Sequence, residues 1–311
     1  MSRRSKNRFD AVDGLLLLNK PAGLTSNQAL QRVKRLLNAR KAGHTGSLDP
    51  AATGMLPLCF GEATKVCAFL LNADKSYRVT AKLGVATDTG DADGTESATA
   101  DVPELSRDEW LAILEGFLGE SEQIPPMYSA LRQGGKRLYE LARKGETVER
   151  KPRPIRIDAI ELLEIAGTRL VFTVHCAKGT YIRSLVEDIA ARAGTVAHTV
   201  RLHRESVADF QADDMIELPR VEAAAKEGLA ALRDSLLPPD AALQALPAIA
   251  LDAGAGQRFA AGQTVSGVLD EAASGLTRVY GGAGEFLGVG ELSDAGQVAP
   301  RRVFLGGEKN P

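Results

Sequence analysis

A loop spanning residues 42–65 concentrates the side chains that could do chemistry. Its sequence, AGHTGSLDPAATGMLPLCFGEATK, is rich in glycine and proline and offers four candidate reactive residues, namely His44, Thr45, Ser47 and Asp49. Gly43 and Gly46 allow the backbone to turn tightly and to approach a ligand closely. Pro50 restricts the backbone beside Asp49. A carboxylate fixed in this way can act as a nucleophile, although an Asp-Pro pair is also a common turn former.

Several common catalytic motifs are absent from the sequence. There is no P-loop, no G-x-S-x-G nucleophile elbow and no H-x-E with P-C-x-x-C deaminase signature. The segment TDTGDADG at residues 87–94 resembles a calcium loop, but with Gly94 in the sixth position the twelfth falls on Ala100, so the bidentate acid is missing. We interpret this segment as an acidic surface loop. We therefore expect no metal and no cofactor; a metal-dependent hydrolase using His44 and Asp49 is a weaker hypothesis.

The distribution of charge is more informative than its total. The net charge is −2, but residues 1–50 carry ten Lys/Arg against three Asp/Glu, and residues 131–156 carry nine against three. Clustered cations of this kind are typical of proteins that bind nucleic acid, although a single charged run is also an ordinary solvated surface. The acidic residues are concentrated elsewhere, as in residues 84–130, with eleven acids against one base. The sequence thus contains two basic zones.

The cysteines and the N-terminus indicate the compartment. Cys59, Cys67 and Cys176 form no C-x-x-C pair and are odd in number, so they predict neither a zinc site nor a disulfide framework. The basic N-terminus is followed by an apolar run, Gly14 to Leu18, that is too short for a signal peptide or a membrane span. We expect a cytoplasmic protein that does not enter the membrane.

Patterns of hydrophobicity and capping indicate the elements that must position the loop. Strands are expected at residues 12–19, 75–85, 152–165, 168–178 and 199–210, and helices after Thr25, after Ser106 and over 136–144, 180–193 and 218–237. These elements alternate without a βαβ rhythm. We predict an α/β (α+β) catalytic domain on a mixed, largely antiparallel sheet, residues 1–244, followed by a small β-rich domain, residues 245–311, expected to be all-β.

The loop GHTGSLDPAATGMLPLCFGEATK is one of several distinctive segments, which also include LLLNKPAGLTSNQAL, KSYRVTAKLGVATDTGDADG, QIPPMYSALRQGGKRLYELARKG, KGTYIRSLVEDI, VRLHR and VAPRRVF. In this order, the segments together resemble the TruB family of bacterial tRNA pseudouridine-55 synthases. The resemblance covers most of the chain. It implies an isomerase that detaches uracil from C1′ of the ribose, rotates it and reattaches it through C5, which requires no redox cofactor or metal.

The resemblance also implies roles for individual residues. Asp49 would be the catalytic carboxylate, attacking C1′ or C6 or assisting elimination at the sugar. Arg183 would pair with it and keep its pKa low. Tyr77 would stack on the flipped uracil, returning about 1–3 kcal/mol of the flipping cost, and its hydroxyl would be able to help move a proton. Tyr181 and Leu202 would line the pocket, and His44 would fill the space vacated by the base.

The same resemblance implies a partner and its binding surfaces. The T arm stem-loop of tRNA would be gripped by a basic insertion at about residues 124–152, with Lys20 and the N-terminal arginines extending that surface. The C-terminal module resembles a PUA-type RNA-binding domain. We expect a monomer without an obligatory protein partner. The alternative is a non-catalytic RNA-binding protein or tRNA folding chaperone, a role that could coexist with catalysis.

Overall fold

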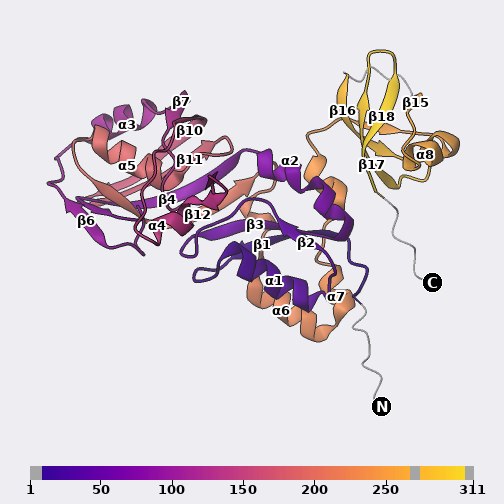
Figure 1. Cartoon of the computed structure of the whole chain (residues 1–311), viewed down its shortest axis with the longest axis horizontal. Coiled ribbons are helices and arrows are strands. Elements are labelled where there is room, and N and C mark those ends of the chain that lie inside the picture. Colours follow the sequence, from indigo (N-terminus) through magenta and orange to yellow (C-terminus); the bar gives the residue numbers. More distant parts are fainter. Residues whose placement is uncertain (1–8, 267–273, 305–311) are drawn as a thin grey trace.

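The computed structural model describes residues 9–266 and 274–304 (Figure 1). The N-terminal arginines expected to extend the RNA surface lie in residues 1–8, outside the described residues. The strands of the larger sheet are β1 (Gly14–Lys20), β2 (Ala42–His44), β3 (Thr53–Phe60), β4 (Lys75–Leu83), β7 (Gly119–Gln123), β10 (Arg153–Ala166), β11 (Arg169–Cys176), β12 (Ala197–Val207) and β13 (Ile216–Glu217). The strands of the smaller, C-terminal sheet are β14 (Ala248–Ala250), β15 (Val265–Ser266), β16 (Gly275–Tyr280), β17 (Phe286–Leu292) and β18 (Gln297–Val303).

The remaining elements are short hairpins and helices. Two-stranded hairpins are formed by β5 (Val85–Thr87) with β6 (Glu96–Thr99), and by β8 (Arg132–Gln133) with β9 (Lys136–Arg137). The α-helices are α1 (Ser26–Leu36), α2 (Cys67–Asn72), α3 (Arg107–Glu115), α4 (Leu138–Ala142), α5 (Ile182–Arg192), α6 (Leu218–Glu227), α7 (Leu229–Arg233) and α8 (Ala253–Ala260). Short 3₁₀ turns are η1 (Gly61–Val66), η2 (Ala212–Asp214) and η3 (Pro239–Leu243). Among the described residues, no helix has the length and apolar character needed to span a membrane.

The larger sheet is mixed and largely antiparallel, as predicted. Its strand order is β13-β1-β3-β12-β4-β11-β10-β7, with β2 added beside β3. Only the β1–β13 and β3–β12 pairs are parallel, and β3 meets β12 at just two register positions, Thr53–His203 and Gly54–Arg204. The sheet is therefore joined weakly at its centre and more strongly within each half. The segment 42–65, predicted to be one loop, is a loop only over residues 45–52, because β2, β3 and η1 take up the rest.

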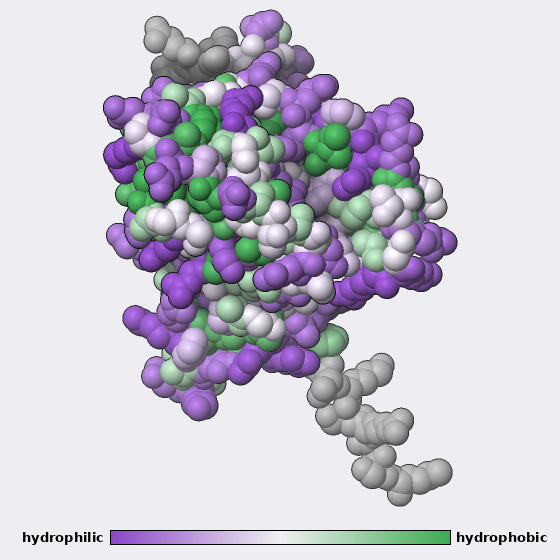
Figure 2. Space-filling view, turned by 90° about the vertical axis from the view of Figure 1, so that its left-hand side faces the viewer, coloured by the Kyte–Doolittle hydropathy of each residue, from purple (hydrophilic) through white to green (hydrophobic). Residues whose placement is uncertain are grey.

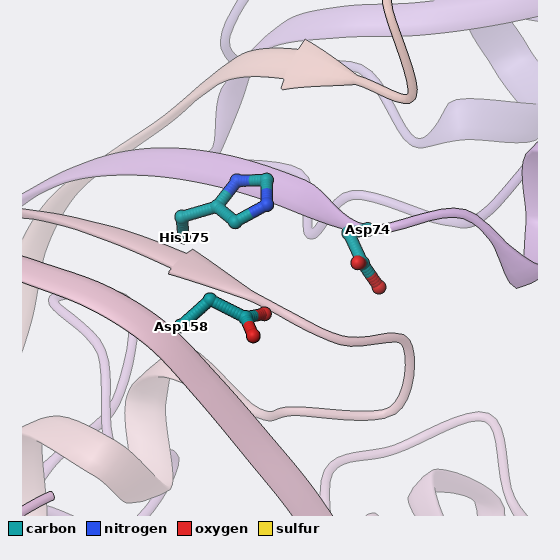
Figure 3. A group of neighbouring side chains, drawn as sticks. All are labelled: Asp74, Asp158 and His175. Carbon is teal, nitrogen blue, oxygen red and sulfur yellow. The ribbon is translucent and has the colours of Figure 1, made fainter. Parts of the chain in front are cut away.

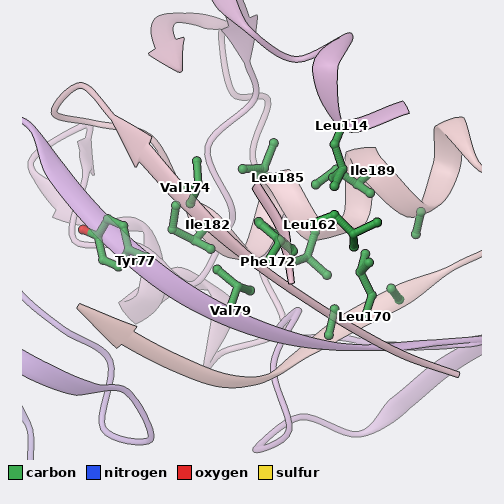
Figure 4. Close-up of a cluster of buried hydrophobic side chains, with 14 of the residues drawn as sticks. Tyr77, Val79, Leu114, Leu162, Leu170, Phe172, Val174, Ile182, Leu185 and Ile189 are labelled. Carbon is green, nitrogen blue, oxygen red and sulfur yellow. The ribbon is translucent and has the colours of Figure 1, made fainter. Parts of the chain in front are cut away.

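Two groups of helices cover this sheet, one over each half (Figure 1). On one half, α3 and α5 pack over β4, β10 and β11 and enclose a core that includes Leu114, Phe172 and Ile189 (Figure 4). On the other half, α1, α6 and α7 pack against β1 and β3 through residues such as Leu30, Leu56 and Leu232. Each half thus has its own apolar core, and the functional loop lies between them.

Local sequence signals account for many of these elements. Thr25 caps α1 and Ser106 caps α3, and each forms a complete capping box with the residue three positions later. In β4 the side chains of Tyr77, Val79 and Ala81 are buried while the intervening ones are partly or fully exposed, which is the predicted alternation. These positions are therefore determined by short-range sequence patterns.

Two details of the predicted elements are wrong. The helix expected over residues 218–237 is divided into α6 and α7 by Gly228, whose φ of 140° an α-helix cannot accommodate. The C-terminal domain is not all-β, because α8 begins at an Asp252 cap and buries Phe259 against the small sheet. Its glycine density conceals a short amphipathic helix.

The C-terminal domain contacts the catalytic half of the chain through a small interface. Val66 and Phe69 pack in one apolar cluster with Val289 and Phe304, and Lys65 donates a hydrogen bond of 2.7 Å to the carbonyl of Val303. At the opposite end of the molecule, which carries α3 and β6, hydrophilic residues cover most of the surface with apolar patches among them (Figure 2). The domain boundary near residue 245 stays a prediction.

Candidate active site

The loop between β2 and β3 is held by hydrogen bonds from two directions. Ser26, at the start of α1, accepts the Leu48 N–H at 2.7 Å and donates its hydroxyl to the Leu48 carbonyl at 3.1 Å. The Pro50 carbonyl accepts the Gly23 N–H at 2.8 Å. Asp49 lies between these two anchors, so the backbone that carries its carboxylate is fixed on both sides.

Arg183 and Asp49 form an ion pair at the centre of the site. Arg183 lies in the first turn of α5, its side chain is only 6% exposed, and its Nε is 3.0 Å from Oδ2 of Asp49. The rest of the guanidinium donates to the Thr89 carbonyl at 2.5 Å and the Tyr128 carbonyl at 2.6 Å. One side chain therefore connects the Asp49 loop, the 87–94 loop and the start of the insertion.

The pKa of Asp49 differs in direction from the expected one. Burial raises the pKa of this carboxyl above its usual 3.8, and the charges of Arg183 and Lys20 only partly offset the rise. The charge of Asp91 adds to the rise. Because the side chain is 42% exposed, water moderates the effect. Arg183 lowers the pKa of Asp49, as expected, but the expectation of a low pKa was wrong, because burial of the carboxylate raises the pKa more.

Lys20 is not on the RNA-facing surface where it was expected. Its side chain is fully buried, and Nζ donates to the carbonyls of Pro21, Leu24 and Pro50 at 2.9, 2.8 and 3.2 Å. Burial lowers the pKa of Lys20 to about 8. This lysine therefore anchors the backbone next to Asp49 through its hydrogen bond to the Pro50 carbonyl. The continuous burial of β1, including Lys20 at its end, explains why it cannot reach bulk solvent.

Arg204 is a second buried cation, which sequence reasoning missed. Its side chain is 1% exposed, and it donates to the Met55 carbonyl at 2.6 Å and the Gly46 carbonyl at 3.2 Å. It thereby connects β3 with the loop that precedes it. Gly54 permits this approach, because a Cβ there would lie 2.3 Å from the Arg204 carbonyl oxygen. Strand periodicity could have indicated Arg204, since it is two residues from Leu202 on the same face.

The other predicted site residues surround this pair at different depths. A pocket is lined by Asp49, Arg183 and Leu202 together with Ala52 and Thr199, among others. Tyr77 is not among its lining residues: it is 8% exposed and packs in the same apolar cluster as Leu48 and Ala52. Burial raises the pKa of Tyr77, with the nearby Arg204 opposing the rise. The phenol therefore stays protonated at neutral pH.

Tyr181 and His44, like Tyr77, are not among the residues that line the pocket. Tyr181 is the residue before α5, and its backbone is fixed by two hydrogen bonds to the Gln123 side chain, of 2.8 and 3.1 Å. His44 ends β2, and its buried Nδ1 has no hydrogen-bond partner among the described residues. Burial lowers the pKa of His44, and the Arg204 charge acts in the same direction. The imidazole is therefore neutral near pH 7.

The 87–94 segment is not merely an acidic surface loop. Asp91 lines the same pocket as Asp49, and its Oδ2 is 3.7 Å from Nη1 of Arg183. Thr89 receives a hydrogen bond from that arginine and donates its hydroxyl to the Asp91 carboxylate at 2.6 Å. The segment therefore forms one wall of the site. Its resemblance to a calcium loop concealed a role as the second carboxylate partner of Arg183.

One group of possible metal ligands occurs among the described residues, and it excludes Asp49 and His44. It consists of Asp74, Asp158 and His175, which extend from adjacent strands and their ends (Figure 3). Arg156 already bridges both carboxylates, at 2.8 and 2.7 Å. A guanidinium therefore supplies the positive charge that these acids require. The hypothesis of a hydrolase with His44 and Asp49 as metal ligands gains no support.

Comparisons with known proteins agree with this geometry. The sequence profile described as "TruB family pseudouridylate synthase (N terminal domain)" matches residues 34–182. "tRNA pseudouridylate synthase B C-terminal domain" matches residues 183–244, and "Pseudouridine synthase II TruB, C-terminal" matches residues 247–304. The three matches follow one another along nearly the whole described chain.

Similar proteins cover the chain almost completely. The tRNA pseudouridine synthase B of Nitrosococcus oceani is 49% identical over 97% of this chain and 98% of its own length. That of Tolumonas auensis is 45% identical over 99% and 97%. Among solved structures, a Cbf5-Nop10-Gar1 complex contains a chain with a TM-score of 0.73 and 27% identity, covering 94% of this chain and 85% of that one. The chain therefore belongs to the TruB family of pseudouridylate synthases.

Proposed function

We propose that Asp49 is the carboxylate with which this enzyme converts uridine 55 of tRNA to pseudouridine, and that Arg183 orients it. The isomerase activity on tRNA follows from family membership. The assignment of Asp49 depends on one observation, the 3.0 Å ion pair with a buried arginine at the wall of a pocket. A carboxylate that is fixed by a guanidinium and by an anchored loop is held in one orientation before the substrate arrives.

The surroundings of Asp49 suit a reaction on a flipped nucleotide. Arg183 and Lys20 favour the ionised carboxylate, which is the form that can attack C1′ or C6 or assist elimination at the sugar. Leu202 and Ala52 supply apolar wall for a flat base. We propose that Tyr77 contacts this base once the pocket is occupied, with its protonated phenol available to move a proton.

The remaining site residues receive roles that depend on RNA being present. We propose that Tyr181 contacts the target nucleotide from the N-terminal end of α5. His44 would enter the space that the base vacates, and its unpartnered Nδ1 would acquire a nucleotide partner there. Neither side chain lines the pocket in the absence of RNA. Their effects should therefore appear in RNA affinity as well as in turnover.

We further propose that the T arm is the part of tRNA that enters the site. The β8–β9 hairpin and α4 carry exposed Arg132, Lys136 and Arg137 and would hold its stem. The C-terminal domain would contact RNA outside the pocket. We also propose that the enzyme is cytoplasmic and acts as a monomer without an obligatory protein partner. Light scattering with and without tRNA can test whether it is a monomer.

The decisive experiment compares Asp49→Asn with Asp91→Asn on an unmodified tRNA transcript. Both carboxylates face Arg183, so the pair tests which one reacts. We expect Asp49→Asn to bind tRNA but to form no pseudouridine, and Asp91→Asn to retain conversion at a reduced rate. Asp93→Asn, an exposed change in the same loop as Asp91, is the control for general effects.

Conversion by Asp49→Asn at a rate near that of the unchanged enzyme would refute the assignment. Loss of conversion in Asp91→Asn alone would transfer the catalytic role to Asp91. An Asp49→Asn enzyme that binds but does not convert tRNA also provides the means to measure any tRNA folding role separately. Refolding of a misfolded transcript by that variant would show that the two roles coexist.

A further inference from the structure

The half of the sheet covered by α3 and α5 leaves its other face open. In β4 the inward side chains, such as Tyr77 and Val79, are buried, whereas Arg78 and Lys82 are exposed on the opposite face. The neighbouring strand β12 pairs Arg201 with Thr80 of β4, and β11 pairs Arg169 with Lys82. Adjacent strands therefore place their exposed cations side by side on one surface.

We define this basic face as Arg78, Lys82, Arg169 and Arg201, and most of its charge is uncompensated. Arg169 forms an ion pair of 3.5 Å with Glu164. Arg78, Lys82 and Arg201 have no ion pair with any of the described residues. Glu205 of β12, at the irregularity between Arg204 and Ser206, and Glu161 of β10, opposite Thr173, form no ion pair with these cations. Along β4, Arg78 and Lys82 are separated by about 13 Å.

The basic face adjoins the active-site pocket around one residue. Val200 lines the Asp49 pocket, and it also lines a hollow with Lys82, Arg169 and Arg201. Val200 lies at an irregularity between Thr199 and Arg201, where the β12–β4 register shifts, and its side chain is 40% exposed. Between His203, where β12 last meets β3, and Thr199, where it bridges Asp91, the edge of β12 carries Val200, Arg201 and Leu202. A chain leaving the pocket can therefore pass this edge to the basic face.

We propose that the basic face binds the phosphate backbone of the tRNA substrate at nucleotides outside the hairpin that enters the active site. Three unpaired cations spread over about 13 Å match several phosphates of an extended RNA backbone. The cations lie on exposed strand positions and are not paired with acids, so their charge is available to a polyanion. The face would increase affinity and set orientation without reading sequence. This inference rests on the proposed function at Asp49.

The experiment measures how a test variant and a matched control variant bind and convert two RNAs. The test variant carries Arg78→Ala, Lys82→Ala and Arg201→Ala. The control variant removes three exposed cations from the helices of the other half, with Arg35→Ala, Arg220→Ala and Lys226→Ala. Full-length tRNA and an isolated T-arm hairpin are each titrated from low to high salt, and the conversion of each RNA is followed in parallel.

We expect the test variant to bind full-length tRNA about tenfold more weakly at low salt, and its salt slope to fall by about 2 to 3. Hairpin affinity and hairpin conversion should equal those of the control variant, which also shows that the fold is intact. Equal binding of full-length tRNA by both variants would overturn the proposal. An equal loss on both RNAs would overturn it too, because the face would then bind the hairpin itself. Failure of the unchanged enzyme to convert either RNA would instead refute the proposed function.

Discussion

Replacing Arg183 separates its two roles, which are to connect neighbouring loops through hydrogen bonds and to supply a positive charge beside Asp49. Its guanidinium pairs with Asp49 through Nε and donates to the carbonyls of Thr89 and Tyr128. Arg183→Met removes all three contacts with a side chain of similar length. Arg183→Lys keeps a positive charge near Asp49, but a single ammonium cannot reach acceptors that lie on separate loops. The two variants therefore differ mainly in charge.

The size of each effect follows from the contacts. A hydrogen bond from a charged group to a carbonyl is worth about 1.5–3 kcal/mol, so losing those to Thr89 and Tyr128 should lower the free energy of unfolding by about 3–5 kcal/mol in both variants. The pair with Asp49 adds little to stability, because that carboxylate is 42% exposed. In catalysis, loss of the fixed partner should lower kcat by about 10²–10³-fold in Arg183→Met.

The pH dependence gives the sharpest test of the charge. Burial and Asp91 raise the pKa of Asp49, and Arg183 opposes them. Without that charge the pKa of Asp49 rises further, so the acid limb of kcat/KM moves to higher pH in Arg183→Met. In Arg183→Lys the limb should return toward that of the unchanged enzyme, while the loss of stability should remain. The measurements are single-turnover rates from pH 4 to 9 and unfolding in urea.

One result would refute this reasoning. If the acid limb of Arg183→Met stays at its original pH while kcat falls, the arginine does not control the ionisation of Asp49. The same limb in Arg183→Lys and Arg183→Met would likewise show that geometry alone, and not charge, determines the effect. A change in stability without any change in rate would reduce Arg183 to a structural connector between loops.

Three further predictions follow from the buried groups. Because the pKa of Lys20 is lowered to about 8, the folded protein binds fewer protons than the unfolded protein between about pH 8 and 10.5, and this group makes stability rise with pH in that range. The rise is up to about 3 kcal/mol, and Lys20→Met should lose it when urea unfolding is measured across the same pH range. Gly54→Ala should lower the free energy of unfolding by at least about 2 kcal/mol, because φ at this residue is +100° and the added Cβ would meet the backbone of Arg204. The control is Gly167→Ala, where φ is +55° and the Cβ would lie in open space, and it should lower the free energy of unfolding by about 1 kcal/mol. Tyr77→Phe should lower kcat by about 10²-fold with little change in KM if its hydroxyl moves a proton, and an unchanged kcat would restrict Tyr77 to packing.

Short-range patterns in the sequence predict much of this fold. The caps at Thr25 and Ser106 and the alternation of β4 depend on neighbouring residues, so they can be identified without tertiary information. The α6–α7 break at Gly228 and the helix at the Asp252 cap are also local, but each was hidden by composition. An alanine-rich run indicates one helix, and a glycine-rich region indicates strands.

The site was predicted less completely, because burial depends on contacts between distant segments. The ion pair of Asp49 and Arg183 was anticipated from family resemblance, and the structure places the two groups 3.0 Å apart. The sequence does not show that β1 is covered on both faces, and so Lys20 was interpreted as an RNA contact. Likewise, Asp91 can only be connected with Arg183 once α5 and the 87–94 loop are packed together.

The buried cations suggest why this pocket suits an anionic substrate. Lys20, Lys75 and Arg204 all donate to backbone carbonyls, and none forms an ion pair with a described residue. Carbonyls satisfy their hydrogen-bonding needs but do not neutralise their charge. The burial of charge costs stability, as the pKa values of about 8 for Lys20 and Lys75 indicate. Of these charges, that of Lys20 opposes the rise in the pKa of Asp49, and the three together favour an approaching phosphate backbone, which a neutral core of the same shape would not do.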